Sequence, residues 1–149
     1  MKTFFKTSLI AIAFLIAGCA GAQNENIYSK KGIAVDGYDL VSYFNDKPLE
    51  GNDQFTVVYE GATYHFTTAE HRDTFKASPE KFLPEYGGFC AYAIATDNKK
   101  VKIDPETYEI RDGKLYLFYN AWGVNTLDKW LEEDPKSLQT KADANWSGL

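Results

Sequence analysis

Residues 61–82 read GATYHFTTAEHRDTFKASPEKF and contain both histidines of the chain. In residues 64–66 two aromatic side chains alternate with His65, as on a strand, whereas His71 and Phe75 lie four residues apart, as on one face of a helix. The periodicity therefore changes from strand to helix within a few residues. The segment predicts a strand end that meets a helix start, and the rest of the fold is expected to pack around this junction.

Strand patterns with turn residues between them predict two hairpins. Glu60-Gly61 offers a tight turn in the first, and Asp112-Gly113 in the second is typical of a type I′ turn, because both central residues of that turn need positive φ. The predicted strands are a short apolar strand at 33–35, residues 55–59 and 63–67, a short strand at 101–103 before a turn at Asp104-Pro105, and residues 108–111 and 115–119.

Helical patterns occupy the remaining parts of the mature chain. Thr68 can cap a helix that runs to Ala77 and ends before Ser78-Pro79, because the residue before proline is pushed out of helical geometry. The other predicted helical segments are a turn through residues 40–44 capped by Asp36, a short helix at 79–82, a helix at 121–133 and a last helix after Pro135.

These elements predict a single α+β domain over residues 32–149, with a small antiparallel sheet built from hairpins and helices packed on it. Trp130 and Trp146 are expected to anchor the last two helices to the sheet. The glycine-rich and aromatic segment 84–95 is expected to be buried against the first hairpin. The tyrosines at 38, 43, 86, 92, 116 and 119 are expected to belong mainly to the core.

The N-terminus is typical of an export signal. Lys2 and Lys6 precede an apolar run that is too short for a comfortable membrane span, so residues 1–18 are predicted to be a lipoprotein-type signal peptide. The run ends in Ile-Ala-Gly-Cys19, which resembles a bacterial lipobox, whose cysteine is acylated. Cleavage after the Ala-Gly-Ala that ends at residue 22 is the alternative.

Residues 19–31 are polar and without periodicity, so they are predicted to be a flexible tether. The expected location is the periplasmic side of the cell envelope, with a membrane anchor at Cys19. Under the alternative cleavage the product is soluble in the periplasm or secreted. The formal charge of −5 becomes two units more negative once the two signal-peptide lysines are removed, which argues against a nucleic-acid partner.

The cysteine count leaves one thiol in the mature domain. Because Cys19 is acylated or cleaved off, Cys90 has no partner for a disulfide. A single thiol of this kind is either buried and inert or exposed and reactive.

The pattern Tyr64, Phe66, Phe75 and Pro79 resembles the YHS domain, and the match spans roughly residues 35–82. The later motifs YGGFCA at 86–91, GKLYL at 113–117 and ADANW at 142–146 are similar to an exported bacterial branch of that family, so the resemblance covers nearly the whole mature chain. The family occurs beside copper-transporting ATPases and in some oxygenases. The resemblance implies binding of a heavy metal, copper first.

The chain departs from the family where metal-binding members carry cysteines. It has Thr67 and His71 at two such positions, and Asp36 stands where an upstream cysteine would precede Gly37. The resemblance therefore implies a metal site whose oxygen and nitrogen ligands are harder than the thiolates of those relatives. The candidate metal ligands are His71, Cys90, His65 and Asp36, and the candidate ions are copper or zinc.

Three of the four candidate ligands also have a structural interpretation. His71 can serve as a hydrogen-bonded residue at a helix start, His65 can face solvent, and Cys90 can act as a small buried hydrophobe. The main functional hypothesis is a non-catalytic metal-binding module. The alternatives are a protein-interaction or structural module without a metal site, whose partner the sequence does not identify, and an enzyme with Cys90 as nucleophile, His71 as base and Asp104 or Asp36 orienting the histidine.

Overall fold

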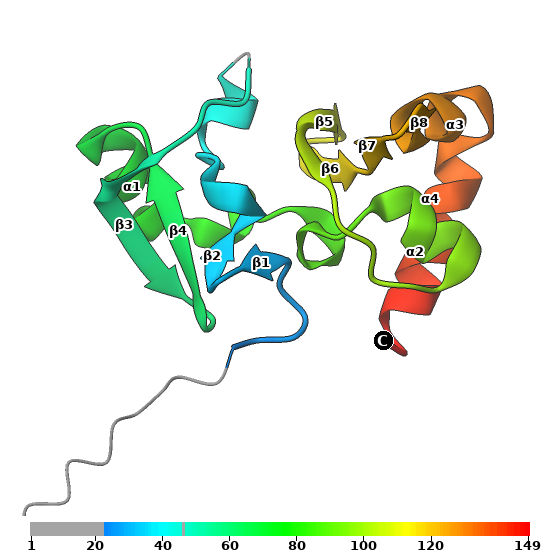
Figure 1. Cartoon of the computed structure of the whole chain (residues 1–149), viewed down its shortest axis with the longest axis horizontal. Coiled ribbons are helices and arrows are strands. Elements are labelled where there is room, and N and C mark those ends of the chain that lie inside the picture. Colours follow the sequence, from blue (N-terminus) through cyan, green and yellow to red (C-terminus); the bar gives the residue numbers. More distant parts are fainter. Residues whose placement is uncertain (1–22, 46) are drawn as a thin grey trace, which may run out of the picture.

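The computed structural model describes residues 23–45 and 47–149, so the predicted signal peptide and Cys19 lie outside the described residues. Two groups of elements lie side by side, one around β1–β4 and α1 and the other around β5–β8 and α2–α4 (Figure 1). The strands are β1 (Ser29–Lys30), β2 (Ile33–Ala34), β3 (Asn52–Tyr59), β4 (Ala62–Phe66), β5 (Asp104–Arg111), β6 (Lys114–Phe118), β7 (Asn120–Ala121) and β8 (Val124–Asn125). The helices are α1 (Ala69–Ala77), α2 (Ala91–Asp97), α3 (Thr126–Glu132) and α4 (Pro135–Trp146). The described residues also form the 3₁₀ turns η1 (Val35–Gly37), η2 (Ser42–Phe44), η3 (Pro79–Lys81) and η4 (Glu85–Gly88). The predicted α+β class is confirmed.

The first hairpin and the helix that follows it form as predicted. Strands β3 and β4 pair antiparallel, and Glu60 and Gly61 between them both have positive φ, at 49° and 85°. Thr68 caps α1 by accepting a hydrogen bond from the His71 amide at 3.1 Å. The Phe75 ring lies 5.1 Å from the rings of both Tyr64 and Phe66 on β4, so the helix packs on the buried face of the strand.

The largest sheet has the strand order β1-β2-β4-β3 and is mixed rather than wholly antiparallel. Strand β2 pairs with β4 in parallel, with Ile33 opposite Thr63. Parallel neighbours need a long connection between them, and here this connection contains η1, η2 and β3. The hairpin prediction therefore holds for β3 and β4, while the outer part of this sheet comes from the segment near the N-terminus.

Part of the predicted tether belongs to the fold. Ser29 and Lys30 pair with β2, and the amide of Tyr28 donates to the Gly87 carbonyl at 2.8 Å. Ile27 and Tyr28 pack against the core. The prediction of a tether up to residue 31 is wrong for residues 27–30, because their backbone groups and apolar side chains find partners in η4 and β2.

The second hairpin forms as predicted at its turn but begins earlier. Asp112 and Gly113 have φ of 51° and 74°, as a type I′ turn requires. The expected strand at 101–103 is absent, and Asp104 and Pro105 start β5 instead of making a turn. A register shift separates Asp104 from Tyr108, which accommodates a proline near the start of the strand.

Residues 121–125 form a small hairpin where the sequence predicts the start of a helix. Trp122 and Gly123 have φ of 54° and 76°, values that a right-handed helix excludes. Strands β7 and β8 flank this turn, and the Asn125 side chain then caps α3 by accepting from the Leu127 amide at 3.0 Å. The helix therefore starts at Thr126. The short helix α2 after Cys90 is a further element that the sequence analysis did not predict.

Strand β6 joins the two halves of the hydrophobic core. Leu115 and Leu117 face the cluster that contains Phe66 and Phe75, and the alternate residues of β6 face the cluster around Trp130. The segment 84–95 is buried, as expected, but mainly against β6 and the helices α3 and α4 rather than against the first hairpin. None of the described helices is both long enough and apolar enough to cross a membrane.

The large aromatic residues occupy the places expected for them with one exception. Trp130 is fully buried, and its ring lies 5.4 Å from the ring of Phe118 on β6. Trp146 is only partly buried and contacts the rings of Tyr86 and Phe89 near η4 instead of the sheet. Of the six tyrosines expected in the core, those at 43, 86 and 116 are buried and those at 38, 92 and 119 are partly buried.

Candidate functional site

The buried carboxylate of Asp39 organises the polar site of the described chain. Asp39 is 0% exposed and lies between η1 and η2. Its Oδ1 accepts from the amides of Val41 and Ser42 at 2.9 and 3.3 Å. Its Oδ2 accepts from the amide and the hydroxyl of Thr67 at 2.9 and 2.7 Å. These bonds hold the carboxylate in place, as a buried charge requires.

His71 is the fifth donor to this carboxylate. Its Nδ1 lies 2.6 Å from Asp39 Oδ2, and the side chain, in the first turn of α1, is 21% exposed. Because the carboxylate can only accept, this contact assigns the ring proton to Nδ1. In the neutral ring Nε2 then keeps its lone pair, and its neighbour is the side-chain amide nitrogen of Asn45 at 3.4 Å. His71 Nε2 can therefore bind a metal ion or accept a proton.

Cys90 has different surroundings. The side chain is 0% exposed, and its Sγ lies 3.2 Å from the Thr126 hydroxyl and 3.4 Å from the amide of Tyr119. These partners belong to the second half of the fold, at the start of α3 and the end of β6. No hydrogen bond joins Cys90 to His71, although both residues are described. The thiol therefore behaves in this structure as a buried, hydrogen-bonded core residue.

His65 and Asp36 lie near the turn η1. His65 sits on β4 between two buried aromatic residues and points to the opposite face of the sheet, where its Nδ1 lies close to Gly37. Asp36 accepts a long hydrogen bond, 3.3 Å, from the Tyr28 hydroxyl. Burial, followed by the charge of Asp36, raises the pKa of Tyr28 to about 12. Asp36 is not the helix cap that the sequence predicts, because its own φ is 51° and the amides of Val41 and Ser42 at the start of η2 donate to Asp39 instead.

The structure therefore brings together a different set from the one expected. Asp39, Thr67 and His71 form one hydrogen-bonded group, whereas Cys90 and Asp36 have separate partners and His65 lies near Gly37. Across residues 23–45 and 47–149, no cluster of three or more His, Cys, Asp or Glu side chains is arranged to hold a metal ion. Among the predicted ligands in the described chain, His71 has the geometry that suits metal binding. Its Nδ1 is hydrogen-bonded to a carboxylate, and its Nε2 is left for an ion.

Sequence analysis missed Asp39, although a signal for it was present. The segment Asp39-Leu-Val-Ser42 has the spacing of an aspartate that accepts from the backbone two and three residues later. Asp36 competed for the same role, and nothing in the local sequence shows that Thr67 and His71 would reach Asp39 from a segment some thirty residues away.

Comparisons with protein-family models, with curated proteins and with solved structures found no match for this chain. The resemblance to the YHS domain therefore rests on the residues quoted for it, and the function has to be argued from the site.

Proposed function

We propose that this chain is an exported, non-catalytic binding module, anchored by lipid at Cys19, which presents His71 Nε2 to a transition-metal ion, copper first. The observation that carries the proposal is the 2.6 Å contact between His71 Nδ1 and the buried Asp39 carboxylate. In protein metal sites, a ligating imidazole usually donates a hydrogen bond from the N–H of its second ring nitrogen to such a group. This bond fixes the tautomer and increases the basicity of the ligating nitrogen.

A site based on His71 differs from the site expected from the resemblance. The residues present fit a single imidazole ligand. They do not support a Cys90 thiolate as a second ligand, because its sulfur is buried and hydrogen-bonded to Thr126 and Tyr119. With one imidazole ligand, the ion takes its other ligands from water or from a second molecule. Binding is then weak and open, as suits transfer of an ion rather than its storage.

The test is a titration of the processed chain with Cu(I), Cu(II) and Zn(II), followed by calorimetry, beside three variants. His71→Gln should weaken binding at least about tenfold, the size of effect that loss of a ligand or of its supporting group produces. Cys90→Ser and His65→Gln should bind as the unchanged chain does. Equal affinity in the unchanged chain and in His71→Gln would overturn the proposal.

A second candidate function, a protein-interaction module, is favoured by the hairpin of β7 and β8. Trp122 at its tip is 92% exposed, and Val124 beside it is 40% exposed. Tryptophan is enriched among the residues that contribute most to protein interfaces. A Trp122→Ala variant that loses co-purifying partners while it keeps its metal affinity would favour this alternative.

A further inference from the structure

The hairpin of β7 and β8 carries an aromatic side chain at its tip that has no packing role. Trp122 is 92% exposed, and apart from chain neighbours no described atom lies within 4 Å of where a Cβ of Gly123 would stand. Trp122 also has φ of 54°, a left-handed conformation that Gly, Asn or Asp adopts at lower cost in such a turn. Neither core packing nor the turn therefore accounts for a tryptophan at this position.

A groove of about 220 Å³ opens beside the same hairpin. Its wall is formed mainly by apolar and aromatic side chains, namely Tyr92, Ala93, Val101, Tyr119 and Val124. The charged residues that line it are Asp97 and Lys129, which are exposed and of opposite sign. Trp122 does not line this groove, so the chain does not fill it with its own hairpin tip.

The groove has the size and the polar groups that an indole ring needs. A cavity of roughly 150 Å³ already holds benzene, so about 220 Å³ can accept the larger fused ring. The Asp97 carboxylate can accept from the indole N–H. Lys129 Nζ lies 5.9 Å from the centre of the Tyr92 ring, where a second aromatic face can share the cation.

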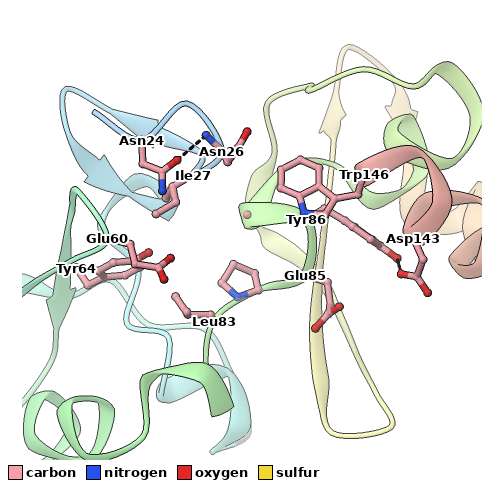
Figure 2. Close-up of a pocket in the computed structure, with 12 residues that line it drawn as sticks. Asn24, Asn26, Ile27, Glu60, Tyr64, Leu83, Glu85, Tyr86, Asp143 and Trp146 are labelled. Carbon is pink, nitrogen blue, oxygen red and sulfur yellow. Dashed lines mark hydrogen bonds between the residues drawn. The ribbon is translucent and has the colours of Figure 1, made fainter. Parts of the chain in front are cut away.

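Figure 2 shows a larger cavity, of about 510 Å³, between the two halves of the fold, but its polar groups already have partners. The Tyr86 hydroxyl donates to Asp143 at 2.9 Å. Lys100 lies over the Trp146 ring at 5.5 Å. The groove beside β8 differs from this cavity, because a side chain that fits the groove stands exposed two residues away from Val124.

We propose that the groove receives Trp122 from a second copy of this chain, and that two copies exchange these tryptophans across a two-fold axis. The tip and the groove belong to one hairpin, so a single axis between them brings each tip to the groove of the other copy. The chain supplies both halves of the contact, which favours a second copy over an unrelated partner. This inference rests on the interaction role proposed above for the hairpin and is independent of the His71 site.

The area available for this contact predicts a weak dimer. A buried aromatic side chain removes about 150 to 250 Å² from water, so two tryptophans and the groove walls that cover them bury roughly 600 to 1,000 Å². Stable complexes bury about 1,200 to 2,000 Å². Each copy also has a negative formal charge, so the copies repel one another and added salt should strengthen an apolar contact between them.

The test is sedimentation equilibrium of the processed chain with Cys19→Ser, which removes acylation as a separate cause of association. From about 10 µM to about 1 mM the average mass should rise from one copy towards two and no further, and more so at high salt. Trp122→Ala should weaken association at least about tenfold. Val58→Thr, at an apolar residue 74% exposed on β3, is the matched control and should associate as the unchanged chain does.

A mixing experiment tests the reciprocal exchange directly. Val124→Arg obstructs the groove and keeps the tryptophan, whereas Trp122→Ala keeps the groove. Each variant alone lacks both contacts of the dimer, but a mixture of the two retains one of them. The mixture should therefore associate more tightly than either variant alone, with circular dichroism showing that both are folded. A mixture that associates no better than its components would overturn the exchange.

The remaining outcomes separate this inference from the proposals on which it borders. His71→Gln should form the dimer as the unchanged chain does, because the metal site takes no part in it. A chain that stays monomeric to about 1 mM, or a Trp122→Ala variant that associates like the unchanged chain, would overturn the inference. If the monomeric chain still loses a co-purifying protein in Trp122→Ala, the hairpin keeps its interaction role and only the second copy is excluded as its partner.

Discussion

Asp39 lies where three segments meet: the loop before η2, the end of β4 and the first turn of α1. Its two carboxylate oxygens accept from four protein groups besides His71, and the side chain is fully buried. Asp39→Ala leaves several of those donors without partners, and each unsatisfied buried group costs about 1 to 3 kcal/mol. We expect the free energy of unfolding to fall by about 3 to 5 kcal/mol, measured by urea denaturation.

The matched control for this prediction is Asp53→Ala on β3, where the side chain is exposed. That variant should change the free energy of unfolding by no more than about 0.5 kcal/mol. His71→Gln should fall between the two, because the carboxylate keeps its other four donors. A loss of less than about 1 kcal/mol in Asp39→Ala would contradict the central place given to this carboxylate.

Two tryptophans of opposite environment provide another test at the scale of single residues. Trp130 is 0% exposed, packs on β6 and donates its indole hydrogen to Glu109 at 2.9 Å, whereas Trp122 is 92% exposed. Trp130→Ala should lower the free energy of unfolding by about 3 to 5 kcal/mol, because it removes a large buried ring and leaves a cavity. Trp122→Ala should leave the thermal midpoint unchanged in the same calorimetric scan. A reversed order would refute the assignment of α3 to the core.

At the scale of elements, alanine substitutions at two glycines with positive φ test how much stability each turn loses without glycine. Gly113, with φ of 74°, has no atom within 4 Å of where a Cβ would lie, so Gly113→Ala meets only the backbone preference of the turn, about 1 to 2 kcal/mol. Gly87 has φ of 61°, and a Cβ there would overlap the carbonyl oxygen of Asn26. Gly87→Ala should therefore be the more destabilising change, measured by urea denaturation.

The Gly87 substitution has a second readout that locates its effect. The N-terminal segment is held to η4 by the bond from the Tyr28 amide to the Gly87 carbonyl, at 2.8 Å. Hydrogen exchange at Tyr28 should become faster in Gly87→Ala and stay unchanged in Gly113→Ala. Equal stability loss and equal protection in the two variants would show that η4 and the N-terminal segment are not tightly packed.

At the scale of the whole molecule, the buried tyrosines predict sensitivity to alkali. Burial and the nearby Asp36 raise the pKa of Tyr28 from 10.0 to about 12, and burial raises the pKa of Tyr43, Tyr64 and Tyr86 as well. Above pH 10 the unfolded chain releases phenolic protons that the folded chain keeps. The free energy of unfolding is therefore unaffected below about pH 10 and falls as the pH rises from there to about 12.

Denaturation curves recorded from neutral pH to about pH 12 check this prediction, with tyrosinate absorbance as an independent signal. Tyr28→Phe should show a smaller loss of stability over the same interval, because one of the retained protons is gone. A free energy of unfolding that stays level through this range would show that these phenols are not protected by the fold.

Local sequence was sufficient to predict the elements that depend on local chemistry. Asp112-Gly113 and Glu60-Gly61 adopt positive φ in their turns, and Thr68 caps α1, because the residue types at those positions carry the preference themselves. The prediction was wrong where two local signals competed. Apolar spacing in residues 121–133 indicated one helix, but Trp122-Gly123 forms a turn and Asn125 starts the helix later.

The candidate site was predicted only in part. His71 is hydrogen-bonded to the Asp39 carboxylate, whereas the sulfur of Cys90 is hydrogen-bonded to Thr126 and Tyr119, between β6 and α3. Spacing along the chain does not show which half of the fold a residue will join, and this holds for the four predicted ligands, His71, Cys90, His65 and Asp36. The parallel pairing of β2 with β4 and the two faces of β6 decide that distribution.

The sequence by itself determined the α+β class, the two main hairpins and the helix that carries His71, since periodicity, turn residues and caps act over a few neighbouring positions. The tertiary structure alone decided that Asp39 would hold His71, that Cys90 would be enclosed near Thr126, and that acidic and aromatic side chains would line one cavity. The physical reason is that these contacts join segments far apart in the chain, and they form only when both clusters bury their apolar side chains against β6.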